Sequence, residues 1–196
     1  MDSADLRALL SRFGALRPQP ASDWTGDVPL HPDLARLYAE VGPWGEDRAP
    51  PRRGASGLMI PTLGDPFWVP PLSRVWALQE GYRWHGLTGA RLPEWHDEWL
   101  VVAERGGDPL VLDLATGAVL YAEHGTGAWG PEPLFADLPT ALAALGTIGA
   151  VHEDAGEDLL DADFEVGPPA RAAVRARLAA FLGDADAEVV ARAFGW

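Results

Sequence analysis

A glycine motif after residue 124 is the first stretch whose spacing could support chemistry. Residues 125–130 read Gly-Thr-Gly-Ala-Trp-Gly, which matches the pattern G-x-G-x-x-G and follows an expected strand. In dinucleotide-binding proteins the residues after this pattern begin a helix whose N-terminus faces the pyrophosphate. Here Pro131-Glu132-Pro133 follows instead. The motif therefore predicts a loop, and we expect no nucleotide cofactor.

Metal ligands and nucleophiles are sparse in this chain. Residues 95–99 bring His96, Asp97 and Glu98 together, but neighbours in a strand point to opposite faces. The five histidines include no pair at i+3 or i+4, the chain has no cysteine, and Ser56 does not lie in a G-x-S-x-G nucleophile elbow. We expect no catalytic residue, no metal and no cofactor. The enzymatic alternative is a small hydrolase whose site is assembled from scattered Asp, Glu and His.

Charge is unevenly distributed along the 196 residues. Fifteen arginines and no lysine oppose 29 acidic residues, for a net charge of −14. Residues 1–98 hold 10 Arg and 13 acids, whereas residues 99–196 hold 5 Arg and 16 acids. Such a field repels nucleic acid and anionic membranes and attracts basic proteins, although acidity can also serve solubility alone. The acidic N-terminus and the lack of an 18-residue apolar run predict a cytoplasmic protein.

The elements expected to position any site include three consecutive strands. Residues 99–104, 109–114 and 118–122 are rich in aliphatic residues and are separated by short glycine turns. Parallel strands need a crossover of a dozen or more residues, and these turns leave no room for one. The spacing therefore predicts an antiparallel meander. A further short strand within residues 57–62 contains Pro61, which favours the edge of the sheet.

Apolar residues at helical spacing predict helices on both sides of this meander in the sequence. We expect them within residues 3–14, 32–42, 70–84, 137–146, 168–182 and 184–196, with Asp137 as an N-cap. Seven acidic residues and no base lie within residues 153–165, which predicts a solvated segment that is mobile or only locally helical. The fold class is thus α+β, an antiparallel sheet flanked by helices. We divide it into a domain over 1–146, an acidic linker over 147–167 and a helical C-terminal extension over 168–196 packed on the same domain.

The order of these elements resembles the SUKH superfamily, the domain shared by yeast cell-wall-synthesis regulators and many bacterial immunity proteins. The resemblance rests on a helix that ends in glycine at 32–42, a strand–turn–strand core at 99–119 with Gly107-Asp108-Pro109 and Asp113-Leu114, and a closing helix at 134–145. It covers about residues 30–146, and the insert at 43–56 and the tail after 146 depart from the family's compact pattern. The resemblance implies an α+β domain that binds and neutralises a toxin domain, often a nuclease.

These observations lead to a hypothesis about partner binding. A basic, nuclease-like toxin would dock on an acidic surface around the meander, because nucleases carry basic surfaces for their substrate. Strand ends and turns of a rigid sheet can present such a surface without costly ordering. The candidate partner-binding residues are Glu94, Asp97, Glu98, Glu104 and Asp108, with Trp95 as the apolar anchor. The alternatives are that these acids only solvate turns, or that the protein is a regulator or scaffold without a toxin partner.

Overall fold

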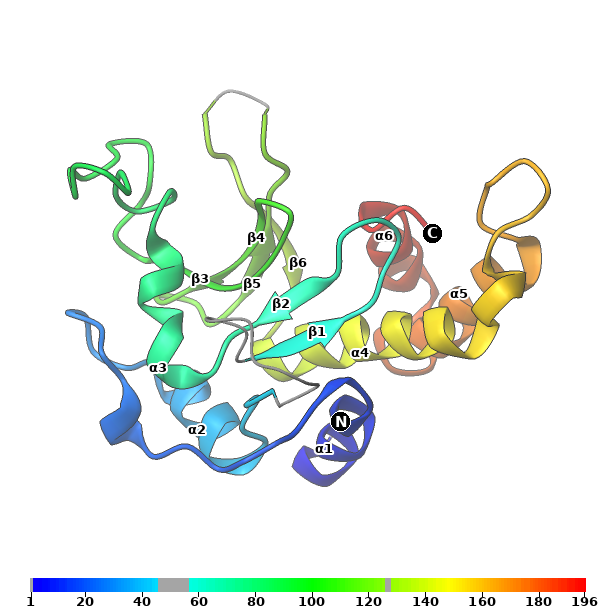
Figure 1. The fold of residues 1–196 in the computed structure, drawn as a ribbon, viewed down its shortest axis with the longest axis horizontal. Helices are drawn as coiled ribbons and strands as arrows, with labels where there is room; N and C mark the ends of the chain where they lie inside the picture. Colours follow the sequence, from blue (N-terminus) through cyan, green and yellow to red (C-terminus); the bar gives the residue numbers. More distant parts are fainter. Residues whose placement is uncertain (1, 46–56, 126–127) are drawn as a thin grey trace.

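A six-stranded antiparallel sheet forms the centre of the protein, and its strands follow one another in chain order (Figure 1). The computed structural model describes residues 2–45, 57–125 and 128–196. The strands are β1 (Leu58–Ile60), β2 (Phe67–Val69), β3 (Trp99–Arg105), β4 (Asp108–Asp113), β5 (Val119–Tyr121) and β6 (Glu132–Phe135). All neighbouring strands pair antiparallel, which confirms the predicted α+β class and the meander of β3, β4 and β5.

The turn between β3 and β4 is as tight as its sequence predicts. Arg105 pairs with Asp108 at the end of the ladder, so only Gly106 and Gly107 connect the strands. Their φ angles are +58° and +101°, a region that side chains with a Cβ rarely adopt. Two-residue hairpins with positive φ at both positions match the natural twist of the strands. The glycine pair therefore fixes where Arg105 and Asp108 face each other.

The edges of the sheet were only partly predicted. β1 lies at one edge, as its proline suggests, and Pro61 comes just after the strand ends. β2 and β6 were not expected, because they are three and four residues long and show no clear alternation of apolar and polar residues. β6 contains Pro133, and it occupies the other edge, where a missing N–H is tolerated.

Helices cover one face of the sheet and share one hydrophobic core with it. They are α1 (Ser3–Leu10), α2 (Pro32–Glu40), α4 (Leu138–Ala155), α5 (Pro168–Leu182) and α6 (Asp184–Ala193). Figure 1 shows α4 running along the sheet, with α1 and α2 below it and α5 beside its C-terminal half. Two glycines of α4 allow this close packing, since a Cβ on Gly149 would lie 2.7 Å from Ile60 and one on Gly146 2.9 Å from Leu9.

The prediction of a helix over residues 70–84 is wrong. The structure has a single helical turn, α3 (Leu72–Val75), then a 3₁₀ turn over Ala77–Gln79. The chain leaves the helical path because the buried side chain of Gln79 bonds to β3: its Nε2 donates to the Val101 carbonyl at 2.8 Å, and its Oε1 accepts from the Val101 amide at 2.9 Å. Tertiary contacts with the strand therefore override the local helical pattern.

The boundary predicted at residue 147 is also wrong, because α4 continues unbroken to Ala155. The acidic tract that follows is partly compensated: Arg12 contacts Glu153 and Asp154, and Arg177 contacts Asp154. Within the tract, Leu160 forms an isolated bridge with Val166 and closes a loop that Figure 1 shows projecting from the body. Helices α5 and α6 contribute to the same core as the sheet through Val174, Leu178 and Val190, and so does Phe194 directly after α6.

Some sequence predictions concern residues outside the described ranges. Ser56 lies there, together with most of the insert at 43–56 and with Thr126 and Gly127 of the glycine motif. Across the described ranges, no helix is long and apolar enough to cross a membrane.

Candidate functional site

The second face of the sheet is covered by aromatic side chains instead of helices. A small core of Leu78, Tyr82, Trp95, Val101, Val111 and Leu120 packs there, with Trp68, Trp99 and Trp129 partly buried against it. The Trp95 ring lies 5.5 Å from Tyr82 and 5.4 Å from Trp99, and Trp129 lies 5.2 Å from Tyr82, all measured between ring centroids. Trp95 and Trp99 meet edge to face, and the other two pairs are tilted, which are favourable arrangements for aromatic rings. The irregular chain over 76–98 is thereby fixed to the sheet.

Residues 91–99 form a rigid surface segment, which we call the acidic shelf. Its backbone is held from below by two side chains. The Trp95 indole donates to the Trp99 carbonyl at 3.0 Å, and the buried Arg83 donates to the carbonyls of Asp97 and Trp99 at 3.0 and 3.2 Å. The Arg83 guanidinium also lies 5.4 Å from the ring of Trp76, and burial is the main cause that lowers its pKa. These bonds connect the backbone of the shelf to the buried side chains of Arg83 and Trp95.

The shelf exposes three of the predicted acids and buries the predicted anchor. Glu94, Asp97 and Glu98 are exposed. Asp97 forms ion pairs with Arg83, at 3.5 Å, and with Arg91. Trp95 is only 2% exposed, so the expectation that it offers an apolar anchor to a partner is wrong. The prediction treated 95–99 as a strand entry, whereas the chain turns here and points the indole into the aromatic core.

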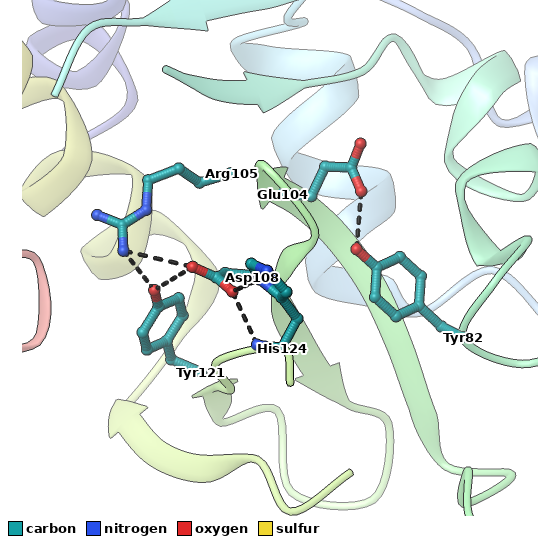
Figure 2. A network of polar contacts seen from close by, with 6 residues as sticks. All are labelled: Tyr82, Glu104, Arg105, Asp108, Tyr121 and His124. Carbon is teal, nitrogen blue, oxygen red and sulfur yellow. Dashed lines mark hydrogen bonds and ion pairs between the residues drawn. The ribbon is translucent and has the colours of Figure 1, made fainter. Parts of the chain in front are cut away.

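Glu104 lies at the end of β3, on the aromatic face. The hydroxyl of Tyr82 donates to its Oε2 at 2.8 Å (Figure 2). Burial, and then this carboxylate, raise the pKa of Tyr82 well above its usual range. Beside Glu104 the surface is hollowed by a depression of about 330 Å³, which Trp68, Arg74 and Glu80 help to line. Glu104 is therefore half-buried and already holds one partner within the chain.

Asp108 is the centre of a polar network on the other side of the same hairpin (Figure 2). Its Oδ1 accepts the backbone amide of His124 at 2.8 Å and lies 2.6 Å from His124 Nδ1. Its Oδ2 accepts the Tyr121 hydroxyl at 3.3 Å and lies 3.5 Å from Arg105 Nη2. Arg105 in turn donates to the Tyr121 hydroxyl at 2.7 Å. The network joins the β3–β4 turn to the end of β5 and the chain that follows it.

The electrostatics of this network favour an ionised carboxylate. Burial acts to raise the pKa of Asp108, but the hydrogen bonds from His124 and the charge of Arg105 outweigh it and lower the pKa overall. The Asp108 side chain is 13% exposed. Its oxygens are used within the chain, so Asp108 braces the hairpin and does not present a free carboxylate to a partner. The predicted partner-binding set is thus divided between the exposed shelf and these bracing contacts.

Sequence reasoning missed the residues that support both parts. Gln79, Tyr82 and Arg83 hold the shelf, and Tyr121 and His124 complete the network around Asp108. Their contacts join residues 13 to 22 positions apart in the sequence. No local pattern could have identified them. Among the described residues, no group of three or more His, Asp or Glu side chains could hold a metal ion.

Comparisons with protein-family models, with curated proteins and with solved structures find no match. The resemblance to the SUKH superfamily therefore stays a prediction.

Proposed function

We propose that this protein is a non-enzymatic, cytoplasmic binding module of the immunity type, which binds and neutralises a basic, nuclease-like toxin domain. One observation carries the proposal: the carboxylates of Glu94, Asp97 and Glu98 are exposed on a shelf whose backbone is fixed by buried side chains. The resemblance to the SUKH superfamily supports the same role.

The charge distribution supports a basic partner. Most arginines in the described part of the chain already pair with carboxylates of the same molecule: Arg12, Arg36, Arg83, Arg91, Arg105, Arg171, Arg175, Arg177 and Arg192. With 29 acids against 15 arginines, many carboxylates are left to face solvent. Such a surface steers a positively charged protein toward it and raises the association rate. Carboxylates can then occupy the Arg and Lys side chains that a nuclease offers to phosphate.

Rigidity supports binding to a folded surface. A partner that binds a flexible segment must offset the loss of its conformational freedom, about 0.5–1.5 kcal/mol for each immobilised side chain. The shelf is already ordered by Arg83 and Trp95, so little backbone ordering remains. Its acids are short or medium-length side chains on a fixed backbone, which suits complementary contacts with a basic protein.

A second candidate function, a small hydrolase, is favoured by one contact. His124 Nδ1 lies 2.6 Å from Asp108 Oδ1, and the His124 side chain is 63% exposed. In hydrolases a carboxylate in such a position orients a histidine that acts as a general base. The same Asp108 oxygen also accepts a hydrogen bond from the His124 backbone amide. The two residues therefore hold two segments of the chain together. The third alternative, a regulator or scaffold of the same fold without a toxin partner, differs from an immunity protein in its genetic neighbourhood.

The test uses the product of the gene next to the one that encodes this chain. An immunity protein should bind the basic domain encoded there and abolish its nuclease activity at a 1:1 ratio, as measured by titration calorimetry and by a nuclease assay. The variant His124→Gln should inhibit as well as the natural protein does. Absence of binding to any neighbouring toxin domain would contradict the immunity role. Loss of the inhibitory effect in His124→Gln, with binding retained, would favour the enzymatic alternative.

A further inference from the structure

A groove lies between β6 and α6, away from the acidic shelf. It has a volume of about 380 Å³, which is in the range of small binding sites. Its lining combines acidic and apolar side chains, among them Tyr121, Glu123, Glu132, Leu134, Val189 and Ala193. The groove therefore offers two kinds of contact within one site.

The apolar wall comes from α6 and from the end of β6. Val189 is 53% exposed, although it belongs to a helix that packs its other face into the core through Val190 and Ala187. Leu134 and Ala193 are partly buried against that core and continue the wall. Alkyl stems of lysine and arginine lie along such apolar surfaces while their charged ends stay in water. The wall is thus suited to a long alkyl chain.

The acidic wall comes from the two chain segments that border the edge of the sheet. Glu132, the first residue of β6, is exposed, and its side chain makes no ion pair among the described residues. Glu123 lies two residues after the end of β5; it is exposed and already interacts within the chain. Carboxylates at this position favour a cation over an anion or a neutral group.

The network around Asp108 keeps the floor of the groove in place. Tyr121 forms part of that floor, is 8% exposed, and has its hydroxyl held by Arg105 and Asp108. His124 fixes the chain beside Glu123 to the same aspartate (Figure 2). The floor of the groove is therefore ordered before a ligand binds.

We propose that this groove receives an arginine side chain of a basic protein partner. The guanidinium pairs with Glu132, and the alkyl stem lies along Val189 and Leu134. Arginine matches better than lysine, because its planar fork can engage a carboxylate through two hydrogen bonds. The inference rests on the proposed function for the class of partner, a basic protein, and assigns to it a second contact apart from the shelf.

The test needs no partner, because a short peptide serves as the probe. Acetyl-Leu-Arg-Leu-amide is titrated into the isotopically labelled protein, and amide shifts are followed by NMR. We expect saturable shifts at residues 121–123, 132–134 and 189–193. The matched peptide with citrulline in place of arginine keeps the shape and loses the charge, so it should bind about fivefold more weakly at low salt.

Two substitutions separate the acidic wall from the apolar wall. Glu132→Gln should remove most of the difference between the two peptides, whereas Val189→Asn should weaken both of them. Glu94→Gln, on the shelf, is the matched control and should change neither. Unperturbed amide spectra elsewhere in the chain show that each variant is folded.

The proposal is overturned if the arginine and citrulline peptides bind the natural protein equally, or if the shifts lie at the shelf instead of the groove. It is equally overturned if Glu132→Gln leaves the difference between the peptides unchanged. Failure of the proposed function looks different: no neighbouring toxin binds, while the peptide still occupies the groove. Conversely, a toxin that binds through the shelf alone leaves the immunity role intact and removes the groove from it.

Discussion

Asp108 holds more neighbouring groups in place than any other carboxylate described above. It accepts hydrogen bonds from His124 and Tyr121 and pairs with Arg105, and it is 13% exposed. Asp108→Asn removes the charge and leaves buried donors poorly matched, so we expect a loss of about 1–3 kcal/mol in the free energy of unfolding. Urea denaturation measures this loss. Glu94→Gln, an exposed acid, is the control, and equal stability of the two variants would contradict the bracing role.

The pH dependence of that loss follows from the lowered pKa of Asp108. A carboxylate with a lowered pKa in the folded state stabilises the protein above its ordinary pKa, which is 3.8. This contribution is lost as the pH falls through the folded-state pKa. The stability difference between the natural protein and Asp108→Asn should therefore be full near neutral pH and shrink in strong acid. A stability difference that grows as the pH falls would contradict a lowered pKa of Asp108.

The chain's three tyrosines give a second prediction at the residue scale. Burial raises the pKa of Tyr38 and Tyr82 far above the ordinary value of 10.0, and it raises the pKa of Tyr121 to about 12 despite the opposing charge of Arg105. A raised pKa stabilises the fold below pH 10, and this stabilisation is lost as the pH rises from 10 toward 12. Phenolate absorbance at 295 nm should thus be absent in the native protein at pH 10.5 and present after unfolding in guanidinium. A native titration centred near pH 10 would contradict the burial of these hydroxyls.

At the scale of elements, one edge of β3 pairs with a neighbouring strand only over a short stretch. Side chains bond to the backbone along the rest of that edge. β2 pairs with β3 at Trp68 and Glu104 only. Farther along β3, Gln79 bonds both backbone groups of Val101, and Arg83 bonds the carbonyl of Trp99. The segment before the shelf thereby takes the place of a missing strand, which explains why it is not a helix.

The variant Gln79→Leu tests whether the Gln79 side chain takes the place of a neighbouring strand. It keeps the approximate size of the side chain but leaves the amide and carbonyl of Val101 without these hydrogen bonds in the core, so we expect a loss of about 2–4 kcal/mol in the free energy of unfolding. The exposed neighbour provides the control, since Glu80→Gln should change stability by less than about 0.5 kcal/mol. Hydrogen exchange at the Val101 amide should accelerate in Gln79→Leu. Unchanged exchange would show that the bond to Gln79 does not protect it.

The elements that local pattern could predict are those with local contacts. The β3–β4–β5 meander follows from aliphatic runs and glycine turns only two to five residues long. The end of α4 was missed because residues 143–151 are apolar or small on all sides, so no amphipathic stripe marks where the helix continues. The three exposed acids of the shelf could be proposed from charge alone. The inward position of Trp95 and the roles of Tyr121 and His124 could not, because they depend on packing between distant segments.

The whole molecule has two differently built faces. Helices and the sheet share the larger core, whereas aromatic rings and irregular chain cover the other face and expose the shelf. Because the chain has 29 acids against 15 arginines, its long-range field attracts a basic partner, and the shelf gives that partner a defined place to dock. The central claim is therefore about location as well as charge: the three acids of the shelf contribute more to the association rate with a basic partner than three acids elsewhere on the surface.

Association kinetics with the neighbouring toxin domain test that claim most directly. The variant Glu94→Gln/Asp97→Asn/Glu98→Gln is compared by stopped flow with Glu157→Gln/Asp184→Asn/Asp186→Asn, which loses three exposed acids outside the shelf. We predict that the shelf variant associates about tenfold more slowly at low salt and shows a flatter dependence on ionic strength, while the control variant changes much less. Equal rates and equal salt dependence in the two variants would contradict a docking site on the shelf.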